Sequence, residues 1–246
     1  MSPKPADPAI RTALLEVAAR IIAAEGSSKL TLRRLAQEVG TSTMAIYTHF
    51  GGMTELRRQV RREGFARLGA HLGAVEVTGD PVADYLVLGW AYYTNATTYP
   101  DLYRAMFMDG PVDAADADAG LDTFAQCVAG AQRCLDGGRF DRADAVDLAT
   151  QAWALLHGVA SLQLAHLLST EEAVASLRSA TLNLFTAFGD DPRSLGRSME
   201  RATKRIGGDP PGSHGAPNAA RSSPFSTLPA PLRGKPSAKT TDLGTL

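Results

Sequence analysis

One short run near the N-terminus constrains the fold more than any other part of this 246-residue chain: LTLRRLAQEVGTSTMAIYTHFGGMTEL, residues 30–56. Thr31 and Ser42 each precede a short helical pattern, where a hydroxyl can cap the free backbone N–H groups of a helix. Gly40 falls between the two patterns, at a position that needs a left-handed turn residue. The run therefore predicts two short helices, 32–39 and 42–47, around a sharp turn.

The side chains of this run divide into an inward and an outward set. The inward set is apolar and small enough for the two helices to pack closely: Leu32, Leu35, Ala36, Val39, Ala45, Ile46 and Phe50. The outward set on the second helix combines hydroxyls with one Met and one Tyr: Ser42, Thr43, Met44, Tyr47 and Thr48. Hydroxyls reach base edges or phosphates, and an apolar tip can meet a thymine methyl group. The second helix is therefore predicted to enter the major groove of DNA.

Charge along the chain supports the same location for nucleic-acid contact. Residues 1–72 hold eleven Lys and Arg against six Asp and Glu, although the whole chain carries a net charge of −1. The middle of the chain is acidic, with Asp109, Asp113, Asp116, Asp118 and Asp122 close together. A basic N-terminal quarter on a near-neutral chain indicates DNA contact by that quarter only. Four arginines, Arg57, Arg58, Arg61 and Arg62, are expected along the exposed side of a helix over 54–72.

The rest of the chain predicts an all-α protein. Apolar residues recur at helical spacing, and no segment shows the period-two alternation of strands. The further helices are expected at 8–25, 81–99, 100–108, 120–135, 142–168 and 170–188. The domain prediction is a disordered N-terminus (1–8), a helix-turn-helix DNA-binding domain (9–72), a C-terminal helical regulatory and dimerisation domain (80–206) and a disordered Pro/Gly/Ser-rich tail (207–246).

No apolar run reaches the ~20 residues of a membrane span, and the first residues have no signal-peptide core, so a cytoplasmic location and no membrane contact are expected.

The N-terminal run resembles the N-terminal domain of the TetR family of bacterial regulators. The resemblance rests on a Thr-x-x-x-Leu-Ala-x-x-x-Gly stretch from Thr31 to Gly40, then Ser42 and a Tyr-x-His-Phe ending at Phe50, and it extends over about residues 10–70. It implies that Thr31 caps a helix and donates to a phosphate. It implies that Ser42, Thr43 and Met44 lie nearest the base edges, and that Tyr47 and His49 contact the phosphate backbone.

Two positions depart from the family pattern, and four have a second interpretation. Thr41 replaces a common Val in the turn, and Met53 stands where the family usually has a Lys that touches a phosphate. The arginines of the next helix are expected to compensate for that Lys. Lys29, Arg33 and Arg34 either flank the DNA backbone or form a solvated helix face. His49 either contacts a phosphate or packs at the edge of the core.

A second resemblance lies in the C-terminal half. Trp153, His157 and Gly158 form a Trp-x-x-x-His-Gly pattern that resembles one C-terminal subfamily of TetR regulators, with a Trp-His-Gly signature. Trp153 and His157 lie one helical turn apart and hence on one face. The family implies a homodimer built from the last two long helices. Their apolar residues Val159, Leu162, Leu182 and Phe185 suit that role, although packing within one subunit would look the same.

The C-terminal domain is also expected to bind a small effector of unknown identity. Aromatic and sulfur-containing side chains predict a cavity for an apolar or aromatic molecule, with the candidates Trp90, Tyr93, Met106, Phe107, Phe124, Cys127, Trp153 and His157. Packing in the core is the alternative role for each of them. Cys127 and Cys134 are interpreted as buried, inert thiols.

The predicted function is a ligand-responsive transcriptional regulator, a repressor that binds a palindromic double-stranded DNA operator as a homodimer and is released by its effector. An enzyme is not expected, because the chain has no Gly-x-Ser-x-Gly elbow, phosphate-binding loop or paired carboxylates. No catalytic residue, metal site or cofactor is expected, since His157 and His166 are not spaced as ligands on one helix face. The alternative is a helical protein-interaction adaptor without specific DNA binding.

Overall fold

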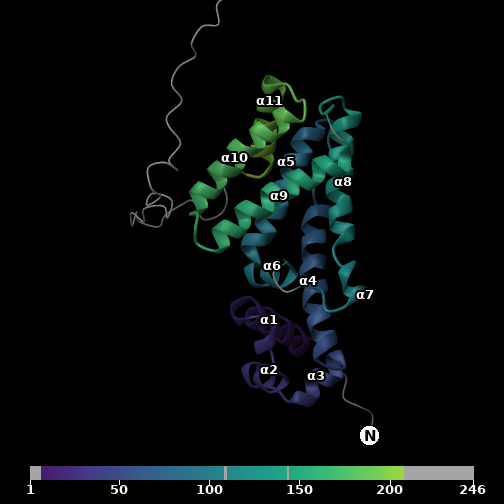
Figure 1. Ribbon diagram of the computed structural model, residues 1–246, viewed down its shortest axis with the longest axis vertical. Coiled ribbons are helices and arrows are strands. Elements are labelled where there is room, and N and C mark those ends of the chain that lie inside the picture. The colour runs from purple at the N-terminus through teal and green to yellow at the C-terminus, as the bar shows by residue number, and fades with distance from the viewer. Residues whose placement is uncertain (1–6, 108–109, 143, 208–246) are drawn as a thin grey trace, which may run out of the picture.

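The computed structural model describes residues 7–107, 110–142 and 144–207, which are helices and turns with no strand among them (Figure 1). In chain order the elements are α1 (Pro8–Glu25), the 3-10 turn η1 (Ser27–Lys29), α2 (Leu32–Val39), α3 (Thr43–Phe50), α4 (Met53–Gly73), α5 (Pro81–Thr98), α6 (Pro100–Phe107), α7 (Ala114–Ala117), α8 (Leu121–Asp136), α9 (Ala145–Leu164), α10 (Thr170–Ala187) and α11 (Pro192–Arg205). The all-α prediction is confirmed. None of the described helices is long and apolar enough to cross a lipid bilayer.

The N-terminal helices enclose their own apolar core. Leu14 and Ile21 of α1, Leu35 of α2 and Ile46 of α3 are at most 2% exposed and pack together. This core also contains Leu102 and Ala105 of α6. The helix α6 lies between α1 and the C-terminal helices (Figure 1). The N-terminal core is therefore completed by residues that lie beyond residue 72, where the N-terminal domain was predicted to end.

Helix α4 belongs to two cores at once. Its first half contributes Leu56 and Val60 to the N-terminal core, and its second half contributes Leu68 and Leu72 to the larger C-terminal core. The helix runs 21 residues from the foot of the molecule into its upper part (Figure 1). Because both ends are packed, a displacement of one end of α4 must be felt at the other.

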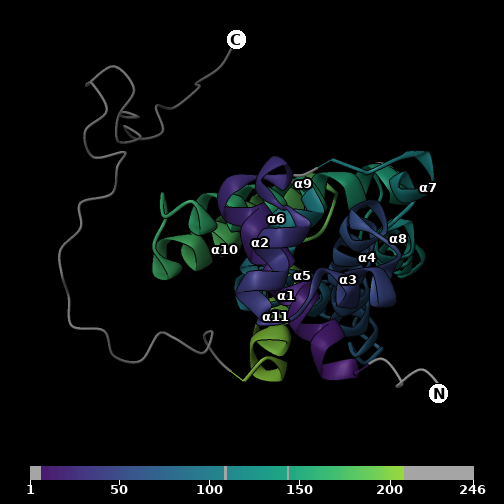
Figure 2. The same cartoon turned by 90° about the horizontal axis from the view of Figure 1, so that it is seen from below.

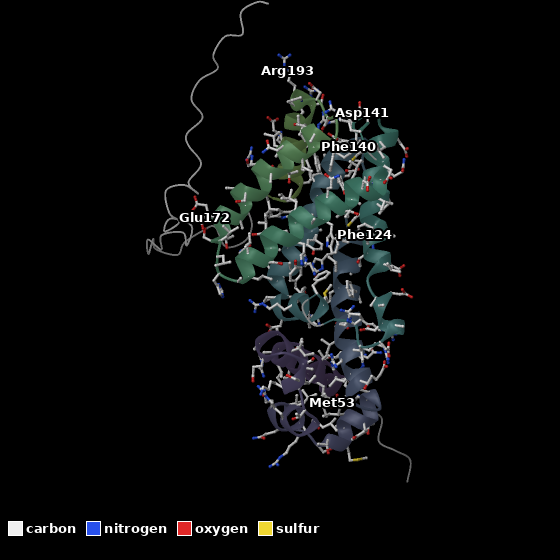
Figure 3. All side chains as sticks on the ribbon, in the orientation of Figure 1. Met53, Phe124, Phe140, Asp141, Glu172 and Arg193 are labelled. Carbon is white, nitrogen blue, oxygen red and sulfur yellow. The ribbon has the colours of Figure 1, made fainter. Side chains whose placement is uncertain are left out.

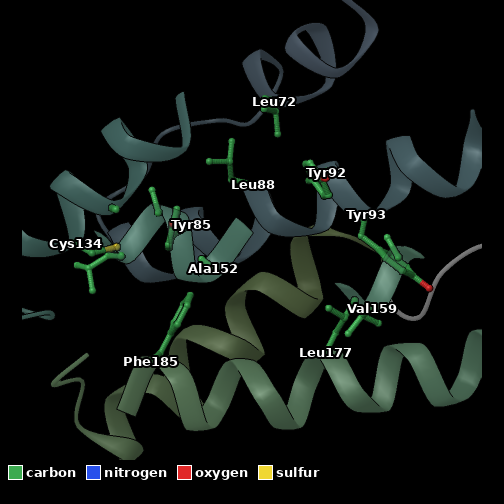
Figure 4. Close-up of a cluster of buried hydrophobic side chains, with 14 of the residues drawn as sticks. Leu72, Tyr85, Leu88, Tyr92, Tyr93, Cys134, Ala152, Val159, Leu177 and Phe185 are labelled. Carbon is green, nitrogen blue, oxygen red and sulfur yellow. The ribbon is translucent and has the colours of Figure 1, made fainter. Parts of the chain in front are cut away.

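The C-terminal helices surround α5. Helix α9 lies on one side of α5 and α11 on the opposite side, with α10 beside them (Figure 2). The C-terminal core includes Tyr85 and Leu88 of α5, Ala152 and Val159 of α9, and Leu177 and Phe185 of α10. Figure 4 shows Leu177 and Phe185 directed from α10 toward this core. Val159 and Phe185, which the sequence offered for a dimer interface, are 8% and 4% exposed and are buried within the subunit.

Helix α11 was not among the predicted helices. Its sequence PRSLGRSMERATKR is mostly polar, with an apolar stripe too narrow to stand out. Two buried carboxylates on the opening of α5 hold it in place. Asp80 accepts hydrogen bonds from Ser198 (2.9 Å) and Arg201 (2.7 Å), and Asp84 accepts from Arg205 (2.5 Å). These contacts span more than 110 residues of sequence, so local patterns could not reveal them.

Several predicted boundaries also need correction. Helix α1 has the predicted bounds, Pro8–Glu25, and Asp7 caps it by accepting a hydrogen bond from the N–H of Ala9, so Asp7 and Pro8 do not belong to the disordered N-terminus predicted for residues 1–8. Helix α3 continues to Phe50 and ends at the left-handed Gly51. Helix α9 ends at Leu164 rather than 168, followed by His166 with φ +59°, a break that no glycine announces. The short α7 was not predicted. Residues 1–6 and 208–246, with most of the predicted disordered segments, lie outside the described residues.

The arginines of α4 are not a free basic face, which corrects the sequence interpretation. Arg61 is 7% exposed, pairs with Asp116 at 2.8 Å and donates to the carbonyl oxygen of Met106 at 2.5 Å. Arg58 pairs with Glu55 and Asp113. The acidic segment of the chain therefore neutralises part of α4. Of the four arginines, Arg62 remains exposed.

We expect Asp84→Asn to lower the free energy of unfolding by about 2–4 kcal/mol, because Arg133 and Arg205 would lose a buried, charged partner. Urea unfolding followed by circular dichroism measures this change. Glu200→Gln is the matched control on α11, since Glu200 is exposed and should change stability little.

The same carboxylate predicts a pH dependence. Burial raises the pKa of Asp84, but hydrogen bonds from Thr78 and Arg205 and the charge of Arg133 outweigh it, so the pKa lies below its ordinary 3.8. A lowered folded-state pKa stabilises the fold above the unfolded pKa, and this contribution is lost as pH falls through the folded value. Wild type should therefore lose more stability than Asp84→Asn as the pH falls below about 4. An equal loss in both proteins would contradict this role of Asp84.

Candidate DNA-binding surface and effector cavity

The turn between α2 and α3 has the geometry that the sequence predicted. Thr31 caps α2 by accepting from the N–H of Arg34, and Ser42 caps α3 by accepting from the N–H of Ala45, both at 3.3 Å. Gly40 ends α2 in the left-handed conformation, with φ +74°. An L-residue with a Cβ would be strained there, so glycine makes the sharp turn possible.

Helix α3 buries one face and exposes the other. Ile46 and Phe50 are 0% and 5% exposed, whereas Met44 and Tyr47 are 67% and 47% exposed. Met44 and Tyr47 lie three residues apart and therefore on the same side of α3. Ser42, Thr43 and Thr48 are exposed on the same helix, and His49 is half-buried. The Thr48 hydroxyl donates to the carbonyl oxygen of Met44 at 2.9 Å, so toward a partner it acts as an acceptor.

The two capping hydroxyls keep a proton for an outside partner. A hydroxyl has one donor and two acceptor positions, and the cap uses only an acceptor position. Thr31 and Ser42 can therefore cap their helices and still donate to a phosphate oxygen.

The cations around α3 differ in how tightly they are held. Arg34 bridges Glu25 (2.5 Å) and Glu38 (2.8 Å), and Arg20 also pairs with Glu38. Hydrogen bonds from Arg34 lower the pKa of both carboxyls. Lys29 and Arg33 are exposed instead. Of the three predicted flanking cations, Arg34 thus has a structural role, and Lys29 and Arg33 are the accessible ones.

Met53 opens α4 beside the end of α3, at the foot of the molecule (Figure 3). It is half-buried and packs against the N-terminal core. A thioether has no proton to donate to a phosphate. Met53 therefore cannot make the contact with the DNA backbone that a Lys at this position would make.

A first cavity of about 260 Å³ lies in the C-terminal half, between α4, α5, α6, α8 and α9. Its walls are mainly aromatic and aliphatic: Phe65, Leu68, Leu72, Tyr92, Phe107, Ala119, Gly120, Leu121, Thr123, Phe124, Cys127 and Trp153. Gly120 closes one wall with φ +99°, and a Cβ built on it would lie 2.3 Å from the Phe65 ring. Three residues of α4 thus contribute to the wall, which joins the cavity to the helix that enters the DNA-binding unit.

A chain of hydrogen bonds lies at one side of this cavity. Trp153 Nε1 donates to the Tyr92 hydroxyl (3.2 Å), which donates to the Tyr103 hydroxyl (3.3 Å). The Tyr103 hydroxyl lies 2.7 Å from Nδ1 of His157. Burial lowers the pKa of His157 and raises the pKa of both tyrosines, so these hydrogen-bonded side chains are uncharged at neutral pH. Neutral, paired groups beside an apolar cavity orient a ligand without placing a charge in it.

The structure divides the eight candidate cavity residues into three sets. Phe107, Phe124, Cys127 and Trp153 line the first cavity. Trp90 lines a separate cavity, and His157 packs edge-to-face against Phe107 with ring centroids 4.8 Å apart. Tyr93 and Met106, at 1% and 2% exposed, are core residues. Met106 packs against Gly64 of α4, where a Cβ would clash with its sulfur at 2.4 Å.

Two family models match the chain. The model for bacterial regulatory proteins of the tetR family matches residues 14–60, and the model for the tetracyclin repressor-like C-terminal domain matches residues 86–184. Together they cover more than half of the sequence. The chain belongs to the TetR family. It is therefore a helix-turn-helix, DNA-binding transcriptional regulator, and the regulators of this family are generally not enzymes.

Individual relatives agree with this assignment. An uncharacterized HTH-type transcriptional regulator of Mycobacterium tuberculosis is 27% identical over 177 residues, 71% of this chain and 79% of the relative. A TetR-family regulatory protein from Rhodococcus RHA1 shares the fold at 20% identity, with a TM-score of 0.64 over 75% of this chain and 100% of its own. AibR, solved with isovaleryl coenzyme A and operator DNA, shares the fold at 14% identity, with a TM-score of 0.54 over 62% of this chain and 86% of its own.

Sequence reasoning missed part of the cavity of this TetR-family protein. Phe65, Leu68 and Leu72 of α4 were assigned to the DNA-binding domain, and Tyr92, which also lines the cavity, was left out of the candidate set. Their aromatic or aliphatic character was visible, but nothing local shows that α4 reaches α8 and α9. Among the described residues, no group of three His, Cys, Asp or Glu side chains is placed to hold a metal ion.

The two cysteines generate a prediction about reactivity. Burial raises the pKa of Cys127 to about 11 and that of Cys134 to about 12, from an ordinary value of 9.0. The thiolate is the reactive form, so both thiols should react with Ellman's reagent about 100-fold more slowly in the folded than in the unfolded protein at pH 8. Rapid, stoichiometric reaction of either thiol in the folded protein would contradict the burial described here.

Proposed function

We propose that this protein is a repressor that binds a palindromic operator as a homodimer and is released by a small apolar or aromatic effector in the first cavity. The observation that carries the proposal is the outward face of α3, where Met44 and Tyr47 are exposed beside the hydroxyls of Ser42, Thr43 and Thr48. Burial of two large side chains against DNA removes their unfavourable exposure, and the hydroxyls supply polar contacts.

Each residue at this surface has a proposed role. Ser42, Thr43 and Met44 meet base edges at the start of α3, and Thr48 accepts from a base amino group one turn later. Thr31, Tyr47 and His49 contact phosphates. Lys29 and Arg33 add charge beside them, and Arg34 positions α2 against α1 through Glu25 and Glu38.

The proposed effector acts through α4. A molecule in the first cavity touches Phe65, Leu68 and Leu72, and the same helix begins at Met53, directly after α3. A ligand that prefers one position of α4 shifts the population toward that position. In a dimer this changes the distance between two α3 helices, which must be about 34–36 Å to fit successive major grooves. AibR, with the same fold, was solved with both an acyl-CoA and operator DNA, which supports a combined ligand and DNA function.

The proposed dimer surface is the outward face of α9 and α10. Gln151, Ala154, Gly158 and Leu162 follow one another at helical spacing on α9 and are exposed. A Cβ on Gly158 would meet no atom within 4 Å in the subunit, so this glycine has no packing role there. Small residues let a second helix approach closely, and Leu162 and Leu182, at 37% and 39% exposed, would be buried by it.

A nuclease footprint on the DNA upstream of the chain's own gene tests the function directly. The apo protein should protect a palindromic site at moderate salt, and one compound from a panel of apolar and aromatic molecules should remove the protection. No specific protection would refute the repressor and favour an adaptor that binds only proteins. Protection that every compound leaves unchanged would refute the proposed effector class.

Substitution Tyr47→Ala should weaken operator binding by about tenfold, the size expected for one lost contact at such an interface. Fluorescence anisotropy with a labelled operator measures the change. The fold should persist, because Tyr47 is half exposed and outside the core. Val77→Ala is the matched control, an exposed apolar residue between α4 and α5 whose loss should not affect binding. Unchanged affinity in Tyr47→Ala would show that another face of α3 meets the DNA.

Substitution Gly158→Glu should produce a folded monomer. The subunit has open space for the new side chain, but two glutamates would face each other across the proposed interface. Sedimentation velocity should show a dimer for wild type and a monomer for the variant, with unchanged helix content. Gly196→Glu on α11 is the matched control, since its Cβ also meets no atom within 4 Å. A dimeric Gly158→Glu protein would place the interface elsewhere.

A further inference from the structure

A second cavity, of about 160 Å³, lies across a wall from the first. Tyr92, Cys127 and Trp153 line both cavities and so form the wall between them. The Trp153–Tyr92 hydrogen bond holds this wall in place. The second cavity is bounded mainly by α5, α9, α10 and α11, with Cys127 of α8 in the shared wall, whereas the first is bounded by α4, α6 and α8 on its other sides.

Helix α11 forms the far wall of the second cavity with Met199, Ala202, Thr203 and Ile206. This helix lies beyond residue 184, where the match to the family's C-terminal domain ends. It is firmly placed, because Asp80 and Asp84, at 9% and 3% exposed, bind Ser198, Arg201 and Arg205. One wall of the cavity is thus built by a part of the chain that the matched domain does not include.

The interior of this cavity is apolar, and its rim carries a positive charge. Apolar side chains make up most of the interior, both aliphatic ones such as Leu86, Leu155, Leu156, Val174, Leu177 and Leu184 and the aromatic rings of Tyr85, Trp90, Tyr92, Trp153 and Phe185. Apart from the aromatic residues, the polar lining residues are Arg178, Thr181 and Thr203, and no acidic residue lines the cavity. Arg178 is exposed and has no hydrogen bond or ion pair to any residue of the described chain. An apolar interior with one unpaired cation at its rim complements an aliphatic chain that ends in an anion.

We propose that the second cavity binds an aliphatic carboxylic acid, with the chain among the leucines and the carboxylate paired with Arg178. Burial of the ligand's aliphatic chain supplies most of its affinity, and the ion pair with Arg178 sets its orientation. This site is separate from the first cavity and does not depend on the effector proposed above. An acid bound there contacts both α10 and α11, so it joins the proposed dimer helix to the C-terminal helix of the described chain.

The two tryptophans of the chain allow the cavities to be distinguished. Trp90 lines the second cavity only, and Trp153 lines both. In a Trp153→Phe protein, which keeps an aromatic ring in the wall but loses the hydrogen bond to Tyr92, tryptophan fluorescence comes from Trp90 and reports on the second cavity alone. 11-Bromoundecanoic acid serves as the probe, because bromine quenches a tryptophan that it contacts. We expect saturable quenching of Trp90 below the critical micelle concentration of the acid. An unchanged Trp90 signal would overturn the proposal.

Filling each cavity in the same background locates the probe. Ala152→Leu narrows the second cavity, and we expect it to weaken quenching at least about tenfold, because the added atoms occupy the space of the chain. Ala119→Leu narrows the first cavity only and should leave quenching unchanged. Thr203→Leu, on the exposed side of α11, is a second blocking variant if Ala152→Leu lowers the thermal midpoint. Quenching that Ala119→Leu removes and the other two variants preserve would assign the acid to the first cavity and refute the proposal.

Substitutions of Arg178 test whether the bound molecule carries a carboxylate. Arg178→Met should weaken binding of the acid about two- to fivefold, the range of an exposed ion pair. It should not change the binding of 11-bromoundecanol, which has the same chain without the charge. Arg178→Lys should retain most of the preference for the acid. Equal binding of acid and alcohol to the wild-type arginine would overturn the assignment of a carboxylate.

Discussion

The packing of α4 into both apolar cores is the constraint on which the rest of the molecule depends. Leu56 and Val60 hold its first half among α1, α2 and α3, and Leu68 and Leu72 hold its second half among the C-terminal helices. Its middle carries Arg61, buried against Asp116, whose unpaired burial would be costly. Because both halves are packed, a movement of α4 in the C-terminal half would also disturb its packing in the N-terminal core.

The two cavities lie at different distances from this shared helix. Residues of α4 form part of the first cavity, so a molecule bound there would touch the helix that enters the DNA-binding unit. The second cavity has no wall from α4 and is closed by α10 and α11 instead. Tyr92, Cys127 and Trp153 separate the two, and the Trp153–Tyr92 hydrogen bond crosses this wall. A single fold thus presents one apolar site next to α4 and another next to the proposed dimer helices.

The surface around α3 shows how few charges remain for DNA once the fold has used its own. Arg34 and Arg20 are occupied by Glu25 and Glu38, and Arg58 and Arg61 are occupied by acidic residues from the middle of the chain. The capping hydroxyls and the exposed Met44 and Tyr47 therefore carry a larger share of the proposed interface than the net charge of the N-terminal quarter suggests. The missing Lys at Met53 makes this dependence stronger.

Local features were predictable from the sequence. The caps at Thr31 and Ser42, the left-handed Gly40, the all-α class and the shared face of Trp153 and His157 follow from short-range sterics and hydrogen bonding, and the structure has all of them. Tertiary structure decided the rest. The partner of Arg61, the position of α11 on Asp80 and Asp84, the burial of Val159 and Phe185 and the separation of Trp90 from Phe107 depend on contacts between residues far apart in the chain. A sequence pattern states which face of a helix is apolar, but only packing determines which helix covers that face and where a space is left.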